Sequence, residues 1–188
     1  MRKIKRGILQ TYSGRVISLT RPDPRSFHAR DIAEGLAKVC RFSGQVHGYY
    51  SVAAHTLNVY ALVRLAGGTL QEQLAALLHD ATEAYIADLP SPAKIKCPGY
   101  VRLEKRLNKA IAKRFNAPET MPAIVKWADD EMLDYERGLL FHGRCPDLKG
   151  AGEIYSLIPQ FLNALNHVLD EIWREEQWNK KELYSDFY

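Results

Sequence analysis

A histidine and an aspartate stand side by side at positions 79 and 80, within the largely apolar segment LLHDATEAYIADLPSPAK (77–94). Polar side chains buried in such a segment without a partner would cost several kcal/mol. A bound metal ion would satisfy an imidazole and a carboxylate together. The doublet alone is a weak signal, but in this context it indicates a metal site.

A divalent ion in a mixed nitrogen and oxygen site needs further ligands. His55 lies four residues before Val59, so we expect it to face inward with the apolar stripe of its helix. Asp129 follows Val125 by four residues, which puts a carboxylate on an apolar face, whereas Asp130 is expected to face water. The alternatives are a core histidine and a surface acid. The predicted metal ligands are His55, His79, Asp80 and Asp129.

The elements that carry these residues are predicted to be mainly helical. Two β-favouring runs flank Ser13-Gly14 and predict a hairpin within residues 8–19. Helices are expected at about 31–39, 51–66, 99–116, 121–141 and 158–177, with one more from Thr69 to the prolines at 90 and 92. The predicted fold is all-α, a bundle of about six helices with a small N-terminal β-hairpin.

Local signals set several of the predicted helix ends. Asp31 and Glu34 have the spacing of a capping box, and so do Thr69 and Glu72. Ser51 is a predicted N-cap, and Gly67-Gly68 ends the helix that follows it. A turn this tight makes neighbouring helices antiparallel, which would bring their inward-facing residues together. Residues 41–50 are predicted to be a loop.

The chain has 188 residues, enough for one domain, 1–188, with its own core. Apolar residues are 46% and charged residues 26%, as in globular proteins, and no apolar run approaches the roughly 20 residues of a membrane span. Three scattered cysteines suggest neither disulfides nor a thiolate zinc site. The basic N-terminus, MRKIKRGILQ, lacks the pattern of a secretory signal. A cytoplasmic location is expected, the host cytoplasm if the chain is phage-encoded.

The predicted ligand set resembles that of the HD-domain phosphohydrolases, in which a histidine on one helix joins a His-Asp doublet on the next and an aspartate on a later helix. The string HDATEAYIADLPSPAK is similar to the HD-x-x-E-x-x-x-x-D-[LV]-x-[ST]-P-x-K block of bacterial 5′-deoxynucleotidases. CRFSGQVHGYYSVAAH and QTYSGRVISL resemble segments of phage and bacterial relatives, including phage dATP triphosphohydrolases. The similarity spans about residues 9–140. The (p)ppGpp hydrolase branch typically has Glu-Asp where this chain has Thr82-Glu83, which argues against alarmone hydrolysis.

The resemblance and the residue chemistry together suggest further roles. Glu83 and, second, Asp88 are candidates to orient the attacking water or shuttle its proton, unless they only hold the histidine tautomers. Arg41 and Lys94 are candidates for phosphate binding, with a solvated surface cation as the alternative. Base or sugar contacts are predicted for Phe42, Gln45 and Tyr50, of which the aromatic residues could equally be core anchors.

The resemblance implies hydrolysis of deoxynucleotides at the α-phosphorus. A dATP-type dNTP triphosphohydrolase, releasing deoxynucleoside and triphosphate, is the preferred expectation. A 5′-deoxynucleotidase acting on dNMPs is one alternative, and a non-catalytic nucleic-acid-binding or regulatory HD module is another. The expected cofactor is a divalent ion (Mn, Co, Zn, Mg, Ni or Fe), because nitrogen and oxygen ligation admits all of these. The expected partner is a nucleotide, without a membrane or nucleic acid, in a homo-oligomer such as a dimer or hexamer.

Overall fold

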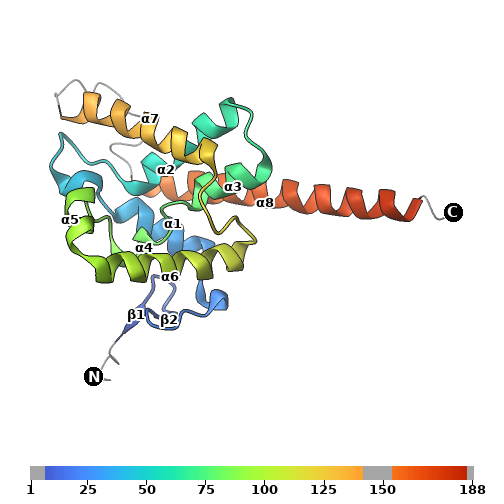
Figure 1. The fold of residues 1–188 in the computed structure, drawn as a ribbon, viewed down its shortest axis with the longest axis horizontal. Helices are drawn as coiled ribbons and strands as arrows, with labels where there is room; N and C mark the ends of the chain where they lie inside the picture. The colour runs from blue at the N-terminus through green and yellow to red at the C-terminus, as the bar shows by residue number, and fades with distance from the viewer. Residues whose placement is uncertain (1–6, 142–153, 186–188) are drawn as a thin grey trace.

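The computed structural model describes residues 7–141 and 154–185, which are mostly helical (Figure 1). The described residues form eight α-helices, α1 to α8, after a two-stranded sheet near the N-terminus. The predicted all-α fold with a small N-terminal hairpin is confirmed. The helices beyond the predicted six are short: α4 (Glu83–Ile86) and α5 (Ser91–Lys96).

The N-terminal hairpin forms where the sequence predicts it. Strand β1 (Ile8–Gln10) pairs antiparallel with β2 (Val16–Ser18). Gly14 in the connecting turn has φ +81°, a left-handed conformation that glycine adopts without steric cost. The hairpin lies against one end of the helical body (Figure 1).

Helix α1 (Ala29–Lys38) begins earlier than predicted, because its expected cap has another partner. The Asp31 carboxylate accepts hydrogen bonds from the amide and the hydroxyl of Ser13, at 2.8 and 2.9 Å. Glu34 forms an ion pair with Lys38 at 2.6 Å. The predicted capping box of Asp31 and Glu34 is therefore wrong, and Asp31 instead ties the hairpin turn to α1.

Helices α2 (Val52–Leu65) and α3 (Leu70–Leu78) pack together and carry the first part of the site. The Ser51 hydroxyl accepts a hydrogen bond from the Ala54 amide, and Thr69 forms the full capping box with Glu72. Both predicted caps are confirmed. Gly67, at φ +77°, turns the chain between the two helices, so that the start of α2 faces the end of α3.

The long helix predicted from Thr69 to the prolines is broken after Leu78. The amide of Ala81 donates to the carbonyl of Leu78 at 3.1 Å, and the amide of Glu83 to that of Asp80 at 2.9 Å. These i to i+3 bonds make a tighter turn than an α-helix. The chain then packs α4 closely on α1, where a Cβ on Gly35 would stand 2.7 Å from that of Ala84. This packing redirects the chain, so the His-Asp doublet lies in a turn and not inside a long helix.

The remaining helices enclose the core. Helices α6 (Pro98–Phe115) and α7 (Ala123–Leu140) lie close to their predicted positions. Helix α8 (Ile154–Ser185) packs against α1, α2 and α3, and its C-terminal part extends beyond the body (Figure 1). Its fully or nearly fully buried side chains recur at helical spacing: Leu157, Phe161, Leu165 and Val168. Among the described residues, no helix has the length and apolar composition that a bilayer span requires.

Candidate metal centre and its cleft

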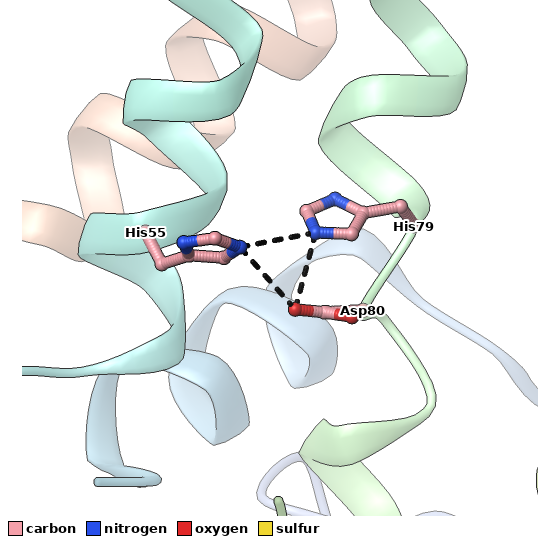
Figure 2. Close-up of side chains that lie close together, drawn as sticks. All are labelled: His55, His79 and Asp80. Carbon is pink, nitrogen blue, oxygen red and sulfur yellow. Dashed lines mark hydrogen bonds and ion pairs between the residues drawn. The ribbon is translucent and has the colours of Figure 1, made fainter. Parts of the chain in front are cut away.

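Three of the predicted ligands converge between α2 and the turn after α3 (Figure 2). The Nε2 atoms of His55 and His79 lie 3.4 Å apart. The Asp80 Oδ2 atom lies 3.1 Å from Nε2 of His79 and 3.8 Å from Nε2 of His55. The antiparallel packing of α2 and α3 produces this convergence, because His55 is near the start of one helix and His79 follows the end of the other. The cluster could hold a metal ion.

Asp129 reaches the cluster from α7. Its Oδ1 atom lies 3.1 Å from Nε2 of His55, and its side chain is 27% exposed. It is not within mutual ligand distance of all three other residues, so it stands at the margin of the group. The neighbouring Asp130 is exposed and pairs with Lys126 on the outer face of the helix, as predicted.

The donor set and its orientation suit a divalent ion. Ligand bonds of about 2.0–2.2 Å place neighbouring donor atoms roughly 3–3.6 Å apart around an ion, close to the spacings in the cluster. The Nδ1 atom of His79 lies 2.7 Å from the carbonyl oxygen of Ala76, which can only accept, so Nδ1 carries a hydrogen. The Nδ1 atom of His55 lies 2.7 Å from a carboxylate oxygen of Glu136. In both rings the second nitrogen, Nε2, is therefore the one left for a metal.

Glu136 also belongs to this site, although it is not among the residues predicted from the sequence. It lies on α7, is fully buried, and contacts His55, Tyr50 and Arg41. Its spacing from Asp129, seven residues or two helical turns, places both carboxylates on the same face of α7. That spacing was the available signal, but Glu136 stands in a run of charged and polar residues that resembles a solvated face.

The charges of the cluster perturb one another. Burial disfavours a charged imidazole, but the Asp80 carboxylate outweighs it and raises the pKa of His79 to about 9. Burial likewise opposes ionisation of Asp80, yet the His79 imidazole lowers its pKa well below the usual range. Beside them, burial and the neighbouring carboxylates of Asp80 and Asp88 raise the pKa of Glu83 to about 10. Strong shifts of this kind concentrate at functional sites.

A cleft with a cavity volume of about 210 Å³, partly open to solvent, adjoins the cluster. This volume is smaller than the roughly 300–1,000 Å³ of typical small-molecule sites. Glu83 is 4% exposed, and its Oε2 atom has no hydrogen-bond partner among the described residues. The charged residues that line the cleft are the acids Asp80, Glu83, Asp88 and Asp129 and the cations Arg41, Lys94 and Arg137.

The structure places both predicted phosphate binders in the cleft, where each already has an acidic partner. Arg41 is buried, with its Nε atom 3.1 Å from Oε2 of Glu136 and its NH1 atom 3.6 Å from Oδ2 of Asp80. Lys94 donates a hydrogen bond of 2.8 Å to Glu104. The third cation, Arg137, was missed. It lies two turns after Asp129 on α7 and forms an ion pair with the exposed Asp134 at 3.6 Å.

The three residues predicted to contact the base or the sugar lie in different places in the structure. Phe42 lines the cleft and packs edge-on against Phe141. Gln45 is exposed and is not among the residues that line the cleft. Tyr50 is fully buried, and its hydroxyl donates to Glu136, so the structure places it beneath the cluster and not in the cleft. Tyr50 therefore has the position of a core anchor, which was the alternative to a base or sugar contact.

Comparison with known proteins gives relatives but no described family, since no family model matches the chain. The chain is 35% identical over 156 residues to the uncharacterized protein YfdR of Escherichia coli (strain K12), which covers 80% of this chain and 85% of YfdR. It is 42% identical over 130 residues to the uncharacterized protein RCAP_rcc00048 of Rhodobacter capsulatus, covering 66% of each chain. The extent of the match to YfdR shows common descent over most of both proteins. The chain therefore belongs to the protein family that includes Escherichia coli YfdR.

Proposed function

We propose that this protein is a metal-dependent phosphohydrolase of the HD-domain type. In this proposal it hydrolyses a deoxynucleoside triphosphate at the α-phosphorus and releases a deoxynucleoside and triphosphate. The observation that supports the proposal is the convergence of His55, His79 and Asp80, with Asp129 at the margin. Beside them is a cleft that contains the buried carboxyl group of Glu83, one oxygen of which has no hydrogen-bond partner among the described residues.

The proposed ligands are His55, His79, Asp80 and Asp129. When bound, a divalent ion would lower the pKa of a coordinated water and offset negative charge on the phosphoryl group. The protein fixes the two imidazoles through their Nδ1 contacts, so each presents Nε2 toward the same point. Binding two imidazoles and two carboxylates leaves room for water and a phosphate oxygen, as catalytic metal sites require.

Glu83 would handle the proton of the attacking water. Its raised pKa makes the ionised carboxylate a strong proton acceptor, and its Oε2 atom, which has no hydrogen-bond partner among the described residues, can orient the water. A metal cation bound beside Glu83 would favour that ionised form. Water would attack the α-phosphorus while its proton passes to Glu83, the bond between the phosphorus and the 5′ oxygen would break, and Glu83 would return the proton to the leaving 5′ oxygen. Asp88, which also lines the cleft, is the second candidate for this role.

The cations of the cleft support an anionic, phosphate-rich substrate. Arg41, Lys94 and Arg137 line the same cleft as the proposed ligands. Guanidinium groups bind phosphate through paired, charge-assisted hydrogen bonds, so several cations suit several phosphates. The acids in the cleft would repel any phosphate group unless a metal ion were bound, so substrate binding is expected to depend on the metal. The basic residues before Gly7, which a nucleic-acid-binding module could use, lie outside the described part of the chain.

A nucleotide panel tests the proposal. The protein is stripped of metal and incubated with each dNTP, NTP, dNMP, NMP and ppGpp, with Mn²⁺, Co²⁺, Mg²⁺ or Zn²⁺ added in turn, and products are identified by mass. The expected products are deoxynucleoside and triphosphate. Phosphate released from monophosphates alone would replace the proposal with a 5′-deoxynucleotidase. Absence of turnover with every nucleotide, despite one bound metal per chain, would overturn it.

A further inference from the structure

The buried carboxylate of Glu136 has no part in the proposed reaction, although it contacts two residues that do. It is 0% exposed. Burying a carboxylate away from water has a large free-energy cost unless charged or hydrogen-bonding partners surround it. Such a group, placed two helical turns from Asp129 and against His55, needs an explanation beyond the packing of α7.

The two oxygens of Glu136 have different partners. Oε1 lies 2.7 Å from Nδ1 of His55 and accepts a hydrogen bond of 2.8 Å from the Tyr50 hydroxyl. That hydroxyl in turn accepts from the side-chain amide of Asn58 at 3.0 Å, which leaves its own hydrogen for Glu136. Oε2 lies 3.1 Å from Nε of Arg41, an ion pair without the geometry of a hydrogen bond. One carboxylate thus connects a proposed metal ligand to a cation of the cleft.

We infer that Glu136 is a positioning residue, which keeps the hydrogen of His55 on Nδ1 so that Nε2 can bind the metal, and which holds Arg41 at the cleft. The inference rests on the metal centre of the proposed function. His79 has a neutral backbone carbonyl in the equivalent place, at 2.7 Å. A carboxylate is the stronger acceptor, and it makes the imidazole a better metal donor.

A merely structural role would look different. If Glu136 served only as the buried counter-charge of Arg41, its replacement would lower stability but leave the His55 ring and the metal affinity unchanged. The variant Glu136→Gln separates these roles because it keeps the shape of the side chain. In either orientation its NH₂ group faces a donor, Arg41 on one side or His55 and Tyr50 on the other. The matched control is Glu131→Gln, the same change at an exposed position of the same helix.

The test measures Zn²⁺ and Mn²⁺ binding by titration calorimetry on the full metal-free chain, with folding checked by circular dichroism. Glu136→Gln is expected to bind one metal per chain about 10-fold to 100-fold more weakly than wild type, and Glu131→Gln to match wild type. A folded Glu136→Gln whose affinity lies within twofold of the control would overturn the inference.

The imidazole signals of the wild-type protein give a measurement that does not depend on a variant folding. In ¹⁵N NMR spectra of the zinc-loaded chain, His55 is expected to show an exchange-protected hydrogen on Nδ1 and none on Nε2. A hydrogen on Nε2 would overturn the inference. Metal binding without nucleotide hydrolysis would remove the proposed function but leave this result standing, whereas a wild-type chain that binds no metal would overturn both.

Discussion

The ligand cluster and the cleft beside it differ in how their polar groups are paired. In the cluster, Nδ1 of each histidine has an acceptor, and each Nε2 lies near a carboxylate. In the cleft, Arg41 and Lys94 have acidic partners, but Glu83 has a buried oxygen with no hydrogen-bond partner among the described residues, and Arg137 is 57% exposed and 3.6 Å from Asp134. Paired groups hold a geometry, whereas unpaired groups are free to act on a substrate. The difference favours a rigid site for the proposed metal ion, next to cleft residues, Glu83 and Arg137, that can act on a substrate.

Removing a ligand should have the largest effect. His79→Ala is expected to weaken Mn²⁺ binding more than about 100-fold and to reduce turnover at least about 1,000-fold, because a metal site depends on each of its few protein ligands. Calorimetry and the nucleotide assay measure the two effects. His167→Ala, on the exposed face of α8, is the control. If His79→Ala kept its metal affinity, the cluster would not be the metal centre.

Replacing Glu83 should lower the rate of the chemical step while leaving metal binding in place. Glu83→Gln is expected to reduce kcat by about 100-fold to 10,000-fold, the usual contribution of a general acid or base. Its metal affinity should stay within about threefold of wild type, because Glu83 lies in the cleft and not in the ligand group. Asp88→Asn in parallel should lose about 10-fold. The reverse order of the two kcat losses would assign the proton to Asp88.

Arg137 should affect the substrate and not the metal. Arg137→Gln is expected to raise KM for the best substrate about fivefold to 10-fold, because one charge-assisted contact to phosphate is lost from a partly exposed site. The value of kcat should change little. The control is Arg102→Gln, an exposed arginine of α6 away from the cleft. Equal KM values for the two variants would show that Arg137 does not bind substrate.

The smallest effect is expected at the start of α2. Ser51→Ala removes the side-chain acceptor of the Ala54 amide and should lower the free energy of unfolding by about 1 kcal/mol. Urea denaturation measures this change. Metal affinity should stay within about threefold, because packing also fixes His55. A large loss of metal affinity would mean that the Ser51 cap itself positions His55. It would also weaken the contrast between the rigid ligand cluster and the cleft residues that can act on a substrate.

Much of the scaffold could be predicted because its signals are local. The hairpin around Ser13-Gly14, the cap at Ser51 and the capping box at Thr69 depend on residues within a few positions of one another. The candidate ligands could be found because polar residues interrupt apolar faces of the chain. The turn of Gly67 between α2 and α3 was enough to predict that His55 and His79 would meet.

The remaining features depend on contacts between distant segments. The chain leaves the helix after Leu78 because α4 packs against α1 at Gly35, far away in sequence. The Asp31 carboxylate accepts a hydrogen bond from the amide of Ser13 in the hairpin and does not cap its own helix. Ser13 is 18 residues away in sequence, so only the folded chain brings the two residues together.

The sequence by itself determined the helical class, several helix ends and the residue types of a candidate metal centre, since these follow from short-range geometry and polarity. Only the tertiary structure decided that Glu136 contacts His55 across 81 positions, that Tyr50 lies beneath the cluster, and that Arg137 joins the cleft. A buried polar side chain finds its partner wherever packing brings one within hydrogen-bond distance, and spacing along the chain does not reveal that partner.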